Sequence, residues 1–178
     1  MFRKILIYGL IAGLIAGVPM SIMTAMPKHE DSGASAMVIG YLTMLIALSA
    51  VFVAVKRHRD ADLGGAIKFW PALGLGLGIS VVAGILYVIA WEFTQAVTHM
   101  DFAGGYAKAM IAQQQAKGVT GEALANFTAE MEKFKVQYAN PLYRWPMTFA
   151  EIFPVGVLVS LISAGLLCNP RFLPLRRA

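Results

Sequence analysis

The chain has 178 residues, of which 58% are hydrophobic and only 14% are charged. Soluble domains carry about a quarter charged residues, so this composition excludes an ordinary soluble globular domain and indicates an integral membrane protein. The formal net charge is +5, but the basic residues flank apolar segments instead of forming one patch, which argues against nucleic acid as a partner. We therefore expect a single membrane domain over residues 1–178, with the lipid bilayer as its surroundings.

The first apolar segment covers residues 5–26 and follows the basic pair Arg3 and Lys4. It is long enough to cross about 30 Å of hydrocarbon as a helix. A cleaved signal peptide is the alternative interpretation, because such peptides also have a basic start and an apolar core. The length of the segment and the position of Pro27 at the expected cut site favour a retained transmembrane helix.

Three further apolar segments predict transmembrane helices, over residues 36–55, 70–98 and 146–167. Between the last two, residues 101–139 are polar and carry two amphipathic helical patterns separated by Gly118 and Gly121, with Asp101 as the expected cap of the first. The predicted fold class is an all-α integral membrane protein: a four-helix bundle with an extracytoplasmic helical hairpin between helices 3 and 4. The apolar stripe of the second hairpin helix, expected to be buried, is Leu124, Phe127, Met131, Phe134 and Tyr138.

The distribution of lysine and arginine predicts the orientation. With the N-terminus inside, the inner side holds most of the basic residues near the helix ends, whereas the first outer loop holds only Lys28. We expect both termini of this multi-pass chain in the cytoplasm and the hairpin outside.

Small residues spaced four apart predict close helix packing. They lie in the first, third and fourth apolar segments. The members of this set are Gly9, Gly13, Gly17, Gly74, Gly78 and Gly156. The partner helix of each face can be another helix of the chain or a helix of a second copy, so a homo-oligomer through these faces is possible.

Several short stretches in the same order along the chain resemble the bacterial membrane family catalogued as domain of unknown function 4199. These stretches are residues 37–41, 59–60, 64–69, 87, 91–92, 131–135, 151–156 and 161–164. The resemblance implies a four-helix membrane protein of a bacterial cell envelope, and together with the expected orientation it implies the bacterial inner membrane as the location. It implies no activity, and it carries over no catalytic residue.

One carboxylate, Glu151, lies about a turn inside the fourth apolar segment, three residues before Pro154. A charge at that depth costs roughly 2.5–3.5 kcal/mol on insertion scales, so Glu151 needs a polar partner, a proton or water. The expected topology brings other polar side chains to the same outer half of the membrane. The candidate polar pocket is Ser21, Thr24, Tyr41, Tyr87, Glu92, Thr148 and Glu151. We expect Tyr41 first, and Glu92 second, as the partner of Glu151.

A simpler interpretation exists for most of this pocket. Glu92 lies near the outer boundary, where a carboxylate is hydrated, and Tyr87 then belongs to an aromatic belt. His29, Glu30 and His99 lack the spacing of metal ligands, so no metal site is predicted. The sequence also predicts no catalytic residue and no cofactor, and one cysteine, Cys168, excludes an internal disulfide.

Three functions from different classes fit these features. The first is a non-enzymatic envelope protein that acts through helix packing and hairpin contacts. The second is a carrier of a small solute, ion or lipid that uses Glu151 and Glu92. The third is an envelope enzyme that uses the same two carboxylates on a lipid-linked substrate.

Overall fold

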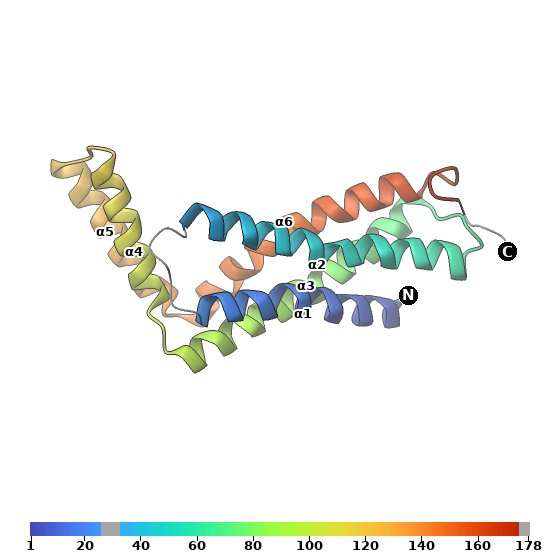
Figure 1. The fold of residues 1–178 in the computed structure, drawn as a ribbon, viewed down its shortest axis with the longest axis horizontal. Coiled ribbons are helices and arrows are strands. Elements are labelled where there is room, and N and C mark those ends of the chain that lie inside the picture. Colours follow the sequence, from blue (N-terminus) through green and yellow to red (C-terminus); the bar gives the residue numbers. More distant parts are fainter. Residues whose placement is uncertain (26–32, 175–178) are drawn as a thin grey trace. The chain divides into compact units, whose positions relative to one another are not determined.

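The computed structural model describes residues 1–25 and 33–174, and all regular secondary structure in these two ranges is helical. Its six helices are α1 (Phe2–Ala25), α2 (Gly33–Asp62), α3 (Phe69–Thr98), α4 (Phe102–Ala116), α5 (Gly121–Tyr138) and α6 (Pro141–Leu167) (Figure 1). Two parts of the sequence-based predictions lie outside the described residues. They are residues 27–32 of the first polar loop, including His29 and Glu30, and the basic pair Arg176 and Arg177.

Four of these helices, α1, α2, α3 and α6, are long and apolar enough to cross a membrane. Their candidate spans contain 24, 25, 30 and 27 residues, respectively. At 1.5 Å per residue each exceeds the roughly 30 Å of bilayer hydrocarbon. The four predicted apolar helices are therefore confirmed.

The second and fourth apolar helices are longer than their apolar runs predict. Helix α2 does not end at Val55 but continues to Asp62, because ion pairs one turn apart support its last turns: Lys56 with Asp60 at 2.6 Å and His58 with Asp62 at 2.6 Å. Gly64 (φ +68°) and Gly65 (φ +100°) follow, a backbone conformation that other residues rarely adopt.

Helix α6 begins at Pro141 and not at Pro146. Proline suits the first helical turn, where its missing N–H has no partner to lose. The side chain of Asn140 caps this start by accepting a hydrogen bond from the Leu142 N–H at 3.0 Å. The Asn140–Pro141 pair therefore starts one helix as well as ending the one before it.

The chain divides into two compact units. The helical unit is Met1–Thr94 with Thr148–Ala178, and the hairpin unit is Gln95–Met147. The first contains α1, α2 and most of α3 and α6. The second contains α4 and α5 with the adjoining ends of α3 and α6.

In the helical unit, the start of α1, the end of α2 and the end of α6 lie together (Figure 1). The Lys4 ammonium pairs with the Asp62 carboxylate, which ties α1 to α2. The Arg59 guanidinium donates to the backbone carbonyl of Phe172, which ties α2 to the segment after α6. The start of the chain and the segment after α6 therefore share one end of this unit.

The glycine face of α1 packs on α3. A Cβ atom added at Gly13 would lie 2.6 Å from the Leu86 Cβ, which is closer than real Cβ atoms approach. Only glycine permits this separation of the two helices. The three pairs are Gly9 with Val82, Gly13 with Leu86 and Gly17 with Ala90. The partner of this small-residue face is therefore within the chain.

Helices α3 and α6 meet through a reciprocal arrangement of glycine and serine. A Cβ at Gly156 would lie 2.6 Å from the Ser80 Cβ, and a Cβ at Gly76 would lie 2.8 Å from the Ser160 Cβ. Each buried serine donates to the carbonyl four residues earlier in its own helix, and the two hydroxyl oxygens are 3.3 Å apart. The serines are thus satisfied without water, as buried polar groups in an apolar region must be.

In the hairpin unit, α4 and α5 pack through an aromatic cluster. Asp101 caps α4 by accepting from the Gly104 N–H at 2.8 Å, as the sequence predicts. The ring centroids of Phe102 and Tyr138 are 5.5 Å apart, and so are those of Tyr106 and Phe134. The predicted apolar stripe of α5 is half-buried at its first four positions and buried at Tyr138. The stripe is therefore partly shielded from solvent within this unit.

Candidate functional site

The carboxyl group of Glu151 has a partner on another helix. The Tyr87 side chain, on α3, hydrogen-bonds the Glu151 carboxyl on α6. Tyr87 is buried, with 5% of its surface exposed, whereas Glu151 lies exposed on the surface of the helical unit. The expected first partner, Tyr41, is itself 47% exposed. A phenol that is held in the core and a carboxyl at the surface therefore form the inter-helix contact that the depth of Glu151 requires.

Tyr87 occupies this position because it continues the buried stripe of α3. Ile79, Ala83, Tyr87, Trp91 and Thr94 follow one another at intervals of three or four residues, and all are buried. The spacing is that of one helix face. The side chains of Tyr87 and Trp91 therefore lie in the core of this unit and not on its surface.

A second polar contact joins α1 and α3. The Thr94 and Ser21 hydroxyl groups are hydrogen-bonded at 2.7 Å. Ser21 donates to the carbonyl of Gly17 at 2.9 Å, and the single hydroxyl hydrogen of Thr94 is shared between the Ser21 oxygen and the carbonyl of Ala90, which is 2.8 Å away. Ser21 is one of the predicted pocket residues. Thr94 was missed, although it lies seven residues after Tyr87 and its helical spacing could have identified it.

The remaining predicted pocket residues differ in how deeply they are buried. Thr148 is buried, with 4% of its surface exposed, and lies near the start of the α6 part of the helical unit. Thr24 and Glu92 are half-buried. The structure thus brings together two pairs, Tyr87 with Glu151 and Ser21 with Thr94. Both pairs involve α3, so this helix contributes one residue to each polar contact.

Among the predicted packing glycines, Gly9, Gly13, Gly17 and Gly156 contact neighbouring helices as described above. Gly78 contacts α1 as well, since a Cβ there would lie 2.8 Å from the Ile5 side chain. Gly74 differs, because a Cβ at this position would have no neighbour within 4 Å. The described chain therefore provides no packing partner for Gly74.

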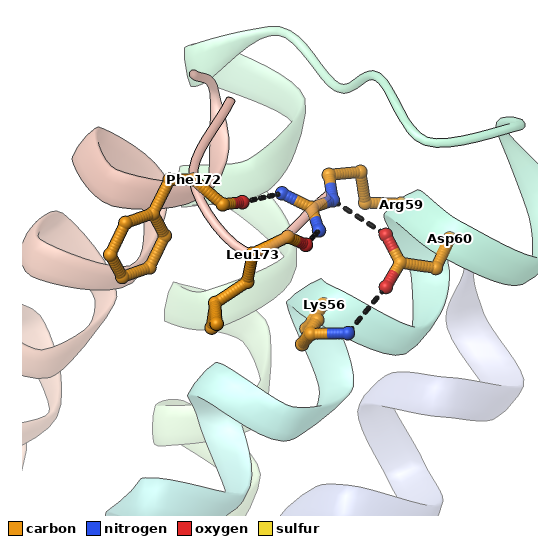
Figure 2. Close-up of polar contacts among 5 residues, drawn as sticks. All are labelled: Lys56, Arg59, Asp60, Phe172 and Leu173. Atoms are coloured by element: carbon orange, nitrogen blue, oxygen red, sulfur yellow. Dashed lines mark hydrogen bonds and ion pairs between the residues drawn. The ribbon is translucent and has the colours of Figure 1, made fainter. Parts of the chain in front are cut away.

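A polar cluster that the sequence did not predict lies at the opposite end of the helical unit from Glu151. Arg59 is completely buried, and Figure 2 shows its guanidinium group between Asp60 and the chain after α6. It donates to Asp60 Oδ1 at 2.7 Å and to the backbone carbonyls of Phe172 and Leu173 at 2.9 and 2.6 Å. Asp60 also accepts from Lys56 at 2.6 Å. We call these residues the Arg59 clamp.

The Arg59 clamp could not be predicted from the sequence, because Arg59 lies within a run of basic residues at the end of α2. Three neighbouring basic residues normally indicate a solvated face, and only the fold reveals which of them points inward. Arginine suits this role because its planar guanidinium carries five donors, and three of them are used here. The clamp fixes the segment after α6 to the end of α2.

Metal binding finds no support within residues 1–25 and 33–174. No group of three or more His, Cys, Asp or Glu side chains in these ranges could hold a metal ion. His99, one of the residues considered for such a site, adopts φ +50° just after α3. The described residues therefore offer hydrogen bonding at Glu151 and anion binding by the cationic side chains near the Arg59 clamp.

Comparison with known proteins places this architecture in a family. A family model described as a protein of unknown function (DUF4199) matches residues 7–169. The chain belongs to this family. The match includes Tyr87, Glu151 and Arg59, and it confirms the resemblance found in the sequence. No curated protein and no solved structure matches this DUF4199 chain.

Proposed function

We propose that this DUF4199 protein is a non-enzymatic integral membrane protein of the bacterial cell envelope, which anchors a helical hairpin and acts through the contacts of that hairpin. The observation that carries the proposal is that the two units are packed in different ways. In the helical unit, glycine faces are used between α1 and α3 and between α3 and α6. The hairpin unit has an aromatic core of its own between α4 and α5, and we propose that its exposed residues contact a partner.

The orientation is part of the proposal. Basic residues gather at the end of the helical unit where the chain starts and where α2 and α6 end. They are Arg3, Lys4, Lys56, Arg57, Arg59, Lys68 and Arg171. Under the rule that positive residues stay inside, this end faces the cytoplasm of a bacterial inner membrane. The hairpin is then extracytoplasmic, because α3 leads to it from the basic end and α6 leads back.

The surface of the hairpin unit supports a role in contacts. The last aromatic residue of α5, Tyr138, is buried and is covered by the Arg144 guanidinium, which lies 5.6 Å from the ring centroid and donates to the Tyr138 carbonyl. Lys135 donates to Glu132 at 2.9 Å, and this hydrogen bond raises the pKa of Lys135 above its ordinary value. On this polar surface Val136 is 75% exposed, the highest exposure of any large apolar residue in α4 or α5.

A photo-crosslinking amino acid at Val136 tests the hairpin as a contact surface. We expect a discrete adduct with one envelope protein or with a second copy of the chain. Glu130, also exposed on α5 but on a different face, is the matched control position and should give no such adduct. Val136→Glu should abolish the complex that the adduct reports, while the melting temperature stays within about 2 °C of the wild type, as surface substitutions usually do. Adducts of equal yield at both positions, or none at any exposed hairpin position, would contradict the proposal.

A homo-oligomer would need helix faces that the chain leaves open. Gly9, Gly13 and Gly17 are covered by α3. Gly40 and Gly165, by contrast, have no neighbour within 4 Å of an added Cβ. If the protein self-associates in the membrane, we propose that it does so through faces of this second kind.

The contact between Tyr87 and Glu151 supports a second candidate function, a carrier of a small solute, ion or lipid. Glu151 is exposed at the surface of an apolar helix, and its hydrogen-bond donor is buried. A carboxyl group at such a depth can exchange a proton or bind a cation as it moves between environments. In this candidate function, the Glu151 carboxyl binds the proton or cation, and the Tyr87 hydroxyl orients the carboxyl.

A further inference from the structure

A shallow groove of about 300 Å³ lies along the outer side of α2, at the basic end of the helical unit. All its lining residues belong to α2. They are Phe52, Val53, Lys56, Arg57, Asp60 and Ala61. The groove is apolar at its inner end, toward the middle of the helix, and charged at its outer end. This polarity is that of an amphiphile, with an apolar chain and a charged head.

The charged end of the groove is positive in spite of Asp60. The Asp60 carboxylate is shared by the Lys56 ammonium at 2.6 Å and the buried Arg59 guanidinium at 2.7 Å, so its charge is compensated twice. Arg57 is exposed, and no carboxylate among the described residues forms an ion pair with it. The three cations and one anion leave an excess positive charge that an anionic group can neutralise.

The apolar end of the groove continues as a stripe along α2. Leu42, Ile46 and Val53 are spaced four and seven residues apart, as on one helix face, and are 53%, 65% and 52% exposed. From Leu42 to Arg57 the stripe extends on the order of 20 Å, at 1.5 Å per residue. One leaflet of a bilayer contains about 15 Å of hydrocarbon, half of the full core. The stripe can therefore accompany an acyl chain over its whole depth.

The wall of the groove is held rigidly by the Arg59 clamp. Figure 2 shows Lys56 and Asp60 on one side of the Arg59 guanidinium and the chain at Phe172 and Leu173 on the other. The Phe172 ring also packs edge-on against Phe52, with ring centroids 6.5 Å apart. The Lys56 ammonium is thus positioned by the fold before any ligand arrives, which lowers the entropic cost of binding at this side chain.

We infer that this groove binds one anionic phospholipid of the cytoplasmic leaflet, with the headgroup phosphate at Lys56 and Arg57 and an acyl chain along Val53 and Ile46. The inference rests on the proposed membrane insertion and orientation. A bilayer supplies this ligand at high local concentration, and anionic headgroups are attracted to basic residues at the membrane surface. The lipid would stabilise the end of α2 together with the segment that the Arg59 clamp holds.

Native mass spectrometry of the full-length protein in detergent tests the inference with phosphatidylglycerol and phosphatidylcholine as probes. We expect one phosphatidylglycerol molecule to bind in preference to phosphatidylcholine. Each lost charge should weaken its binding about five-fold, so Arg57→Gln and the double variant Lys56→Gln/Arg57→Gln should show graded losses. The control Arg3→Gln/Lys68→Gln removes two exposed charges outside the groove lining and should change the binding less than two-fold, that is, by under about 0.4 kcal/mol.

A second variant tests the apolar part. Val53→Trp should fill the groove and weaken phosphatidylglycerol binding, whereas Ile39→Trp, at the other end of α2 and also exposed, should not. Equal losses in groove and control variants would show general surface attraction and overturn the inference. Equal binding of both lipids, or displacement of the lipid by soluble glycerol phosphate at equal concentration, would overturn it too. Carbonate extraction of each variant reports membrane insertion separately, so failure of the proposed function is distinguishable from failure of the lipid site.

Discussion

At the residue scale, Glu151 and Arg59 are ionisable side chains in opposite surroundings, since Arg59 is buried and Glu151 is exposed. Arg59 is buried, but three of its donors are satisfied and a carboxylate lies beside it, which offsets the cost of desolvating a guanidinium. Glu151 is at the surface of the helical unit with Tyr87 as its hydrogen-bond donor. The first arrangement holds the fold together, and the second leaves a carboxyl accessible.

Replacing Glu151 distinguishes the two candidate functions. We expect Glu151→Gln to fold with an unchanged melting temperature, because the glutamine carbonyl can still accept from the Tyr87 hydroxyl. Tyr87→Phe removes that donor and should lower the free energy of unfolding by about 1 kcal/mol. Thermal unfolding in detergent measures both effects.

The same variants should leave proton and cation flux in proteoliposomes unchanged if the protein acts only through contacts. A carrier would instead lose flux in Glu151→Gln while its melting temperature is kept. Thr148→Val, which changes another polar residue of α6 without touching a carboxyl group, is the matched control for the flux measurement.

At the element scale, the spacing of α1 and α3 is set by glycine. Gly13 contacts Leu86 and approaches the Ala83 carbonyl, where an added Cβ would lie 3.2 Å from the oxygen. A larger side chain must push the helices apart or distort the backbone, since protein interiors tolerate little overpacking. Van der Waals contact between closely approaching backbones is a main source of helix association in membranes.

Gly13→Leu should therefore destabilise the protein by about 1–3 kcal/mol or more. Gly74→Leu is the matched control, because the same substitution there meets no atom within 4 Å. We expect a clear fall in melting temperature for the first and little change for the second. The same melting temperature in both variants would remove the packing role of the α1 glycines.

At the scale of the whole molecule, the described basic residues of the helical unit lie at one end, where α1 starts and where α2 and α6 end. The hairpin unit is joined to the helical unit through α3 and α6. An excess of basic residues on one side of a membrane normally marks the cytoplasmic side. In the proposed topology, the Arg59 clamp is therefore inside and the hairpin is outside.

Cysteine labelling on intact spheroplasts checks this topology. In a Cys168→Ser background, a membrane-impermeant maleimide should label Ala116→Cys and Ala125→Cys in the hairpin unit. Ala61→Cys, at the end of α2, should react only after the membrane is permeabilised. All three positions are exposed in the structure, so differences in labelling report the side of the membrane and not burial. Labelling of Ala61→Cys alone would reverse the orientation.

Much of the architecture was predictable from the sequence, because the features concerned are local. Runs of apolar residues predict α1, α2, α3 and α6, since the hydropathy of a segment does not depend on its neighbours. The periodicity of α5 and the cap at Asp101 similarly follow from residues a turn or two apart. The family was also accessible from short local stretches of sequence, and the match over residues 7–169 confirms it.

Pairing between helices was decided only by the tertiary structure. The sequence showed that Gly9, Gly13 and Gly17 form a packing face, but not that α3 covers it. It showed that Glu151 needs a partner, but Tyr87 and not Tyr41 is the donor. Helix rotation and register determine which side chains meet, and the packing of all helices together sets both. For the same reason one arginine of a basic run, Arg59, turned inward while its neighbour Arg57 stayed exposed.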